Sequence, residues 1–319
     1  MKRKIHFEKL WKFIPILGFF ILAYMIYSIG INKILESFKI IPIYYYLFAL
    51  LLLIPREFLR AYQWQYISKK QKMFFKLSYF IKISIIGFFY CNVTPGGLGW
   101  HIRLFYLKNK SKATTEKCLT NSLLETTTSF LTGLSVSLIG SIILFERVPW
   151  LFPILFIFFI FYLTIFVVLL KKSRGSKLFK ILIKPLIPKK YREITDQSVE
   201  LLYEDIPRFR DMIVPFFINS LIFILAGIQT YIISIPFNLN IPIMDFILIS
   251  IISVVTTGIL PISISGIGVR EGVFVVMAQS YGVSSDVAIV ISLAGFIVKS
   301  LILSIVGFVL SIITTKAKK

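Results

Sequence analysis

Charged residues are scarce in this sequence, and acidic residues are the scarcest of them. Only 16% of the 319 residues are charged, whereas 57% are hydrophobic and the mean hydropathy is +0.83. A soluble domain usually carries about 25% charged residues. Several runs approach the roughly 20 apolar residues that cross a bilayer, and backbone groups in lipid must be satisfied within a helix. The composition therefore predicts an all-α polytopic membrane protein.

Cysteine and histidine are nearly absent as well. Cys91 and Cys118 support neither a disulfide framework nor a thiol-ligated metal site, and His6 and His101 lie far apart. No His/Asp metal cluster or Ser/His dyad is visible in the sequence pattern. We therefore expect no cofactor, no metal and no enzymatic activity.

Basic residues outnumber acidic ones by 36 to 15, and their distribution indicates a membrane orientation. Thirty of the 36 gather in five segments, 2–12, 56–76, 103–117, 171–210 and 316–319. The intervening polar segments 31–40, 145–150 and 236–241 hold only Lys33, Lys39 and Arg147. This positive-inside asymmetry predicts a multi-pass protein of the cell membrane with both termini in the cytoplasm. A nucleic-acid partner is not expected.

The hydrophobic pattern predicts a single membrane domain over residues 1–319, with about eight transmembrane helices. We expect them at 13–30, 41–58, 77–91, 118–144, 151–170, 211–235, 242–259 and 286–312. An amphipathic cytoplasmic linker is expected over about 171–210, between repeat-like halves at about 41–144 and 211–312.

Two further segments, 92–107 and 261–282, open with Pro, Gly and small hydroxyl residues. Such broken backbone is tolerated only inside protein or beside a wet cavity, so we expect two broken or re-entrant elements. If each crosses the membrane after a full helix, all five basic segments fall on one side, which is typical of inverted repeats.

Charged residues within apolar sequence are the first candidates for function, because a charge at the bilayer centre costs roughly 2.5–3.5 kcal/mol on insertion scales. Glu125 shares a polar helix face, which fits either helix–helix hydrogen bonding or a wet substrate path. Lys299, in the last helix, fits either an internal salt bridge or a substrate contact. Arg103 follows the first broken segment, and Arg270 and Glu271 lie in the second.

Both broken segments combine small residues with arginine, a set suited to anions. The first provides Thr94, Gly96, Gly97 and Gly99 before Arg103, and the second provides Ser263, Ser265, Gly266 and Gly268 before Arg270. We predict that Glu125, Arg270 and Glu271 meet in one polar cavity near mid-membrane, with Arg103 at or near its mouth and Arg270 contacting phosphate.

The stretches TPGGLGWHIRLFYL and PISISGIGVREGVFVVMAQSYG resemble motifs of the lysylphosphatidylglycerol synthase transmembrane-region family, the flippase-like integral membrane proteins. The resemblance covers nearly the whole chain and implies lipid translocation, with lipid synthesis left to a separate soluble domain. Trp100 and His101 stand where the family commonly has an acidic residue. Thr126 stands where an arginine often follows the matched Glu125, and Lys299 only loosely replaces an arginine of the last helix.

Three functions stay open. The first is a flippase for a phosphate-bearing, glycosylated or aminoacylated lipid. The second is a non-transporting subunit that scaffolds an envelope-lipid biosynthetic enzyme. The third is a transporter of a small anion, proton-coupled through Glu125. The expected partners are membrane lipids with an anionic headgroup and such an enzyme.

Overall fold

The computed structural model describes Tyr24, Tyr27 and residues 31–94, 97–111, 113–170, 202–203, 205–260 and 263–316. The α-helices are α3 (Ile31–Lys39), α4 (Ile43–Leu51), α5 (Leu53–Lys70), α6 (Leu77–Val93), α7 (Arg103–Lys110), α8 (Thr115–Ile143), α9 (Leu151–Leu170), α12 (Ile213–Ser234), α13 (Ile243–Ile259), α14 (Val269–Gln279), α15 (Ser285–Phe296) and α16 (Ile302–Lys316). Short helical turns are η2 (Leu98–Ile102), η5 (Phe209–Met212), η6 (Ile235–Phe237) and the π-helical η7 (Ile297–Leu301).

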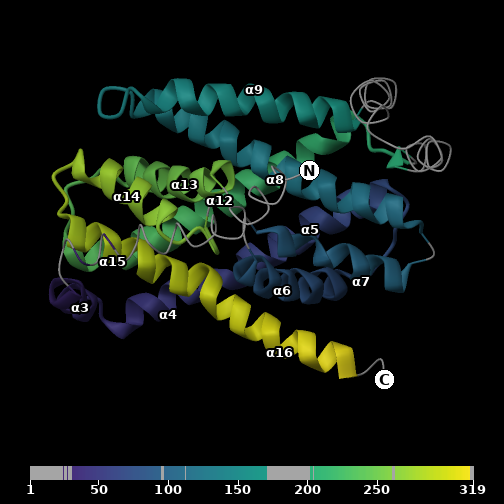
Figure 1. The fold of residues 1–319 in the computed structure, drawn as a ribbon, viewed down its shortest axis with the longest axis horizontal. Coiled ribbons are helices and arrows are strands. Elements are labelled where there is room, and N and C mark those ends of the chain that lie inside the picture. Colours follow the sequence, from purple (N-terminus) through teal and green to yellow (C-terminus); the bar gives the residue numbers. More distant parts are fainter. Residues whose placement is uncertain are drawn as a thin grey trace, which may run out of the picture.

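Four of the described helical stretches are long and apolar enough to cross a membrane. They cover Thr115–Ile143, Leu151–Leu170, Phe209–Phe237 and Ser285–Thr314, and the last combines α15, η7 and α16. The α6 and α13 helices are apolar but shorter. These helices confirm the prediction of an all-α polytopic membrane protein, and Figure 1 shows α9 and α16 on opposite sides of the bundle.

Two of the expected helices are not single regular α-helices in the structure. The single helix expected over 41–58 is wrong: α4 ends at Leu51, and α5 begins at Leu53 and continues to Lys70. Pro55 falls in the first turn of α5, where its missing donor is harmless. The helix expected over 286–312 has a π turn at its centre. The helix expected over 13–30 and most of the linker over 171–210 lie outside the described residues.

The first broken segment folds back beside α6. The Thr94 hydroxyl accepts a 2.7 Å hydrogen bond from the Gly99 backbone N–H. Further along, the Tyr79 hydroxyl, near the start of α6, donates to the Tyr106 carbonyl at 2.7 Å. The chain through η2 and α7 therefore runs antiparallel to α6, and we call residues Leu77–Lys110 the first hairpin.

The second broken segment folds back beside α13 in the same way. Phe246 of α13 packs against Phe274 of α14 with ring centroids 5.7 Å apart. The Tyr281 hydroxyl, just after α14, donates to Asp245 at the start of α13 at 2.8 Å. We call Ile243–Gln279 the second hairpin.

Each broken segment is therefore the returning arm of a hairpin, and its helix is too short to cross a membrane alone. At 1.5 Å per residue, the 8 residues of α7 and the 11 residues of α14 extend about 12 and 17 Å, less than the roughly 30 Å of a hydrocarbon core. Each segment instead returns towards the end of the molecule where its preceding helix began.

The tips of the two hairpins meet inside the molecule. The Ser265 hydroxyl at the second tip donates to the Asn92 side-chain carbonyl at the first tip, at 2.7 Å. Asn92 also donates to the Ser300 carbonyl at 3.4 Å, in the π turn halfway along the last long helix. Figure 1 shows α6 and α7 approaching from one end of the bundle and α13 and α14 from the other.

Ion pairs gather the basic segments at one end of the molecule. Lys70 contacts Asp211 at 2.7 Å, while Lys72 and Lys117 contact Asp205 at 2.5 and 2.7 Å. Hydrogen bonds from Lys117 and Lys72 lower the pKa of Asp205 below its ordinary value. Segments that the charge count put on one side of the membrane are thus neighbours in the fold.

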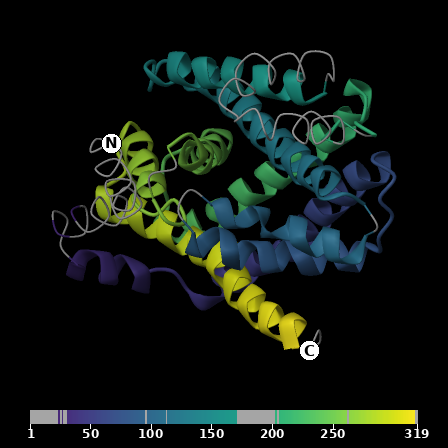
Figure 2. The same cartoon turned by 45° about the vertical axis from the view of Figure 1, so that its right-hand side comes forward.

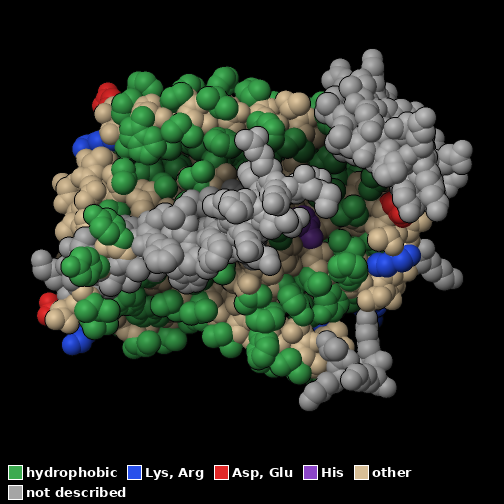
Figure 3. All heavy atoms as spheres, viewed as in Figure 1, with side chains coloured by type: hydrophobic (Ala, Val, Ile, Leu, Met, Phe, Trp, Pro, Cys, Tyr) green, Lys and Arg blue, Asp and Glu red, His purple; other side chains and the backbone are tan. Residues whose placement is uncertain are grey.

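The opposite end joins segments with few basic residues. Arg147 donates to the Ser280 carbonyl at 2.8 Å, and the Ser37 hydroxyl donates to Asp286 at 3.1 Å. Between the two ends, the visible face is mostly hydrophobic, with its Lys, Arg, Asp and Glu side chains near the left and right margins (Figure 3). Figure 2 shows α9 at the edge of the bundle, where its apolar side chains can face lipid.

Candidate functional site

A cavity of about 390 Å³ lies where the two hairpin tips meet. Residues from α5, α6, α8, α12, α13 and η7 form its walls together with the turns at both tips. The side chains that carry charge in these walls are Arg56, Arg60, Glu125, Arg270 and Lys299. The cavity therefore collects charged side chains from helices that are far apart in sequence.

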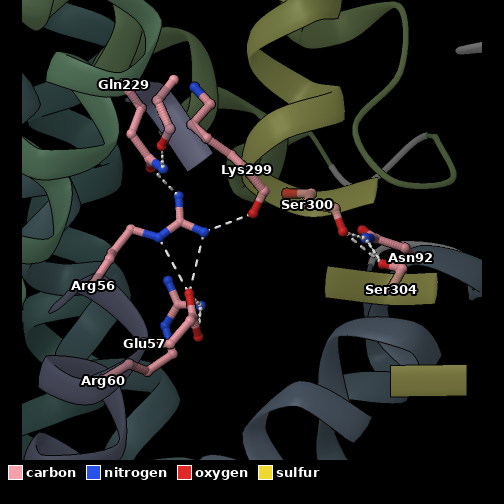
Figure 4. A network of polar contacts seen from close by, with 9 residues as sticks. Arg56, Glu57, Arg60, Asn92, Gln229, Lys299, Ser300 and Ser304 are labelled. Carbon is pink, nitrogen blue, oxygen red and sulfur yellow. Dashed lines mark hydrogen bonds and ion pairs between the residues drawn. The ribbon is translucent and has the colours of Figure 1, made fainter. Parts of the chain in front are cut away.

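Arg56 is the centre of one buried network, shown in Figure 4. Its guanidinium donates to the Gln229 side-chain carbonyl and to the Lys299 backbone carbonyl, both at 2.6 Å. Glu57 accepts from Arg56 at 3.2 Å and from Arg60 at 3.1 Å. Because Arg56 is only 2% exposed, these bonds are what make its burial tolerable.

Lys299 enters the cavity from the π turn of the last long helix. A π turn leaves backbone groups without their usual helical partners and is frequent at functional sites. Here the Lys299 carbonyl accepts from Arg56, while its ammonium donates to the Thr230 hydroxyl at 2.6 Å. Lys299 has three donors, and the internal salt bridge that we left open for it is not formed with any described carboxylate.

Arg103 and Glu125 form a buried ion pair at 2.5 Å. The Arg103 guanidinium lies between Trp100 and Trp64, 3.7 and 4.2 Å from their ring centroids, and its Nε donates to the Trp100 carbonyl at 2.9 Å. Arg103, which we expected at or near the mouth of the cavity, lies behind the lining, in contact with Trp100 and Glu125. Arg103 is 0% exposed, with the cavity-lining Trp100 stacked against it, because two aromatic faces and a carboxylate stabilise the charge there.

Arg270 and Glu271 open α14 beside the cavity. Their side chains form an ion pair, and Glu271 also accepts from the Gly268 backbone N–H at 2.6 Å, which caps the helix. The Arg270 guanidinium lies 4.3 Å from the Phe296 ring centroid. Its Nε is buried and has no hydrogen-bond partner, and the residue, 7% exposed, lines the cavity.

The small residues of the two motifs form the turns themselves. Gly268 has φ +86°, a conformation that glycine adopts without strain. A Cβ at Gly99 would lie 2.1 Å from the Tyr90 carbonyl oxygen, so only glycine lets the two arms of the first hairpin approach. These glycines therefore have a backbone role that needs no ligand.

The candidate residues divide into three groups. Those that line the cavity are Gly97, Glu125, Ser263, Ser265, Gly266, Arg270 and Lys299. Those that contact or shape the lining from behind are Thr94, Gly99, Arg103, Gly268 and Glu271. Gly96 lies outside the described residues. The structure thus brings Glu125 and Arg270 to one cavity, as predicted, whereas Glu271 lies behind the lining and pairs with Arg270.

Sequence reasoning missed Arg56, Glu57 and Arg60, which it had counted within a basic loop. One signal could have found them: Arg56 and Glu57 form an Arg–Glu pair beside a long apolar run, and the second motif holds the same pair at Arg270–Glu271. Gln229 and Asn92 gave no such signal, because single amides in apolar helices are common helix–helix contacts.

The charges around the cavity do not balance. Among the described residues, five cations line it or pair directly with its walls, namely Arg56, Arg60, Arg103, Arg270 and Lys299. Only three carboxylates accompany them, Glu57, Glu125 and Glu271, and each is already paired with an arginine. The site therefore carries an excess of two positive charges, which favours an anionic ligand.

Comparison with known families identifies the chain. Residues 14–307 match the family described as the Lysylphosphatidylglycerol synthase TM region. A comparison with curated proteins yields no match. The family match places the chain among membrane proteins of lipid metabolism or transport. Because the match spans both hairpins and every wall of the cavity, the protein belongs to the Lysylphosphatidylglycerol synthase TM region family.

Proposed function

We propose that this protein is a membrane lipid flippase that moves a phosphate-bearing lipid between leaflets through the cavity at the hairpin tips. The observation that carries the proposal is the excess of positive charge in a cavity between two opposed hairpins. Buried charge of this kind is costly unless an anion or water compensates it. A phosphate headgroup supplies the compensation, and arginine binds phosphate oxygens with a bidentate fork.

The apolar part of the lining supports a lipid rather than a free ion. Apolar side chains from α8, α12 and α13 line the cavity together with the cations, namely Phe130, Ile222, Phe223, Ile251 and Val254. A small hydrated anion gains nothing from such a surface, whereas the glycerol and first acyl carbons of a lipid bury apolar area on it. The mixed lining thus fits an amphiphile.

The protein would act without covalent chemistry, as a passage in the cell membrane with both termini in the cytoplasm. Membrane lipids are its partners in this proposal. Glu125 holds Arg103 in place while the cavity is empty, and the guanidinium of the cavity-lining Arg270 provides the phosphate contact.

Proteoliposomes test the proposal directly. Purified protein is reconstituted with trace lipids that carry a fluorophore on one acyl chain, and a membrane-impermeant quencher reports how much reaches the outer leaflet. The wild type should raise the quenched fraction from about half towards completion. Arg270→Lys keeps the charge but loses the fork, so it should slow translocation while the yield of folded protein stays near wild type.

Two outcomes would favour the alternatives. If lipids stay in place but labelled glycerol phosphate crosses, the protein is a small-anion transporter, and Glu125→Gln should then abolish any proton dependence. If neither moves in the wild type, a scaffold of an envelope-lipid enzyme becomes the better hypothesis.

A further inference from the structure

The imbalance of charge has a consequence for the substrate class. The three carboxylates near the cavity each pair with an arginine, so the negative charge of each is already compensated. The cations of the lining offer hydrogen-bond donors: the Lys299 ammonium makes one hydrogen bond, to Thr230, with its three donors.

We infer that the cavity selects a lipid whose headgroup carries two negative charges, such as a phosphate monoester, and rejects aminoacylated lipids. This inference rests on the proposed function and narrows its substrate. Two negative charges match the excess of two positive charges among the described residues, so the filled site is neutral. A lysyl headgroup would instead bring further ammonium groups against Arg56, Arg60, Arg270 and Lys299.

The positions of the cations support a headgroup of this kind. Arg56 donates to the Lys299 carbonyl, and Lys299 and Arg270 both line the cavity, so three cations from α5, α14 and η7 surround one space. Ser263, 3% exposed and also in the lining, has a hydroxyl without a protein partner. Two arginines, an ammonium and a free hydroxyl match a group with several acceptor oxygens.

The test varies the headgroup alone. Four lipids share the same fluorescent acyl chain and differ in headgroup: phosphatidic acid, phosphatidylglycerol, phosphatidylcholine and lysyl-phosphatidylglycerol. Proteoliposomes are prepared at pH 7, where a phosphate monoester carries about −1.5 to −2 charges. We expect the translocation rate to fall in that order, by roughly tenfold or more from first to last, since like charges repel strongly in a desolvated site. Equal or faster movement of lysyl-phosphatidylglycerol would overturn the inference.

Binding provides a readout that does not depend on transport. The same four lipids are added to detergent-solubilised protein and the shift in Tm is measured, because a ligand that binds the folded state stabilises it. If no lipid moves but phosphatidic acid raises the Tm most, the flippase proposal fails and the headgroup selectivity stands. If soluble glycerol phosphate raises the Tm of the protein as much as phosphatidic acid does, the site recognises a free phosphate and the lipid part of the inference fails.

Matched variants assign the selectivity to the cavity. Lys299→Gln and Arg60→Gln each remove one excess positive charge. Each should reduce the translocation rate of phosphatidic acid to that of phosphatidylglycerol. Lys82→Gln removes a lysine of α6 that does not line the cavity, so it should leave the order of the four translocation rates unchanged. If Lys299→Gln fails to fold, Arg60→Gln supplies the same comparison. Retention of the full preference for phosphatidic acid in folded Arg60→Gln and Lys299→Gln would contradict the charge-matching explanation.

Discussion

Asn92 and Ser265 join the tips of the two hairpins through one 2.7 Å hydrogen bond, although 173 residues separate them in sequence. The Asn92 amide also donates to the Ser304 hydroxyl and the Ser300 carbonyl. One side chain therefore ties the first hairpin to both the second hairpin and the last long helix, beside the cavity.

Replacing Asn92 should loosen this junction. Asn92→Leu removes its hydrogen bonds and leaves the partner groups unsatisfied, so we expect a loss of about 2–3 kcal/mol of folding stability. The measurement is the Tm of purified protein in detergent. Asn240→Leu, in an exposed loop, serves as the control and should leave the Tm near wild type. An unchanged Tm in Asn92→Leu would show that the tips are held by other contacts.

The Arg103–Glu125 pair should show strong energetic coupling. Removing one partner of a buried pair leaves an uncompensated charge, which costs about 3–5 kcal/mol, whereas removing both often costs little. We expect Glu125→Met and Arg103→Met each to reduce the Tm and the yield sharply, and the double variant to recover much of the loss. A double-mutant cycle on Tm checks this, and strictly additive effects would contradict a direct coupling.

The conformation of Gly268 makes it hard to replace. At φ +86° a side chain is strained, and Leu at this position should destabilise the turn before α14 by about 1–3 kcal/mol and abolish translocation. Gly272, one turn further into the same helix, is the matched control because a Cβ there meets no atom within 4 Å. Gly272→Leu should fold and translocate normally. Normal activity of Gly268→Leu would show that this turn tolerates the change.

The two charged ends predict the sidedness of the loops. In a background with Cys91→Ser and Cys118→Ser, we expect Lys69→Cys and Lys189→Cys to be protected from an impermeant thiol reagent in intact cells. Glu146→Cys, at the opposite end, should be labelled. Labelling of Lys69→Cys from outside would show that the protein has the opposite orientation in the membrane.

Much of the fold could be predicted because the bilayer imposes a simple rule on sequence. The apolar run at 151–170 matches α9 residue for residue, and Gly and Pro mark both broken segments. The courses of those segments could not be predicted, since charge counts give only the side on which a loop lies. A helix and a segment that cross the membrane in opposite directions leave the next loop on the same side as a pair that enters the membrane and returns. The inverted repeat stays a prediction, and two opposed hairpins are consistent with it.

The site could be predicted only where motifs mark it. Arg270 and Glu271 stand out in apolar sequence, and so does Glu125. Arg56 does not, because its partners Gln229 and Lys299 lie 173 and 243 residues away and only the folded chain brings them together. The partner of Glu125 could not be predicted either, because Arg103 begins the basic segment 103–117 and therefore resembles a loop residue.

Those same separations set the timing of assembly. A ribosome adds about 5–20 residues per second, so Arg56 is made roughly 10–50 s before the Lys299 carbonyl that it binds. During that interval its charge, and that of Glu57 beside it, must be held outside the lipid interior, next to water or within the insertion machinery. The cavity is therefore one of the last parts of the molecule to form, completed when the final helix enters the membrane.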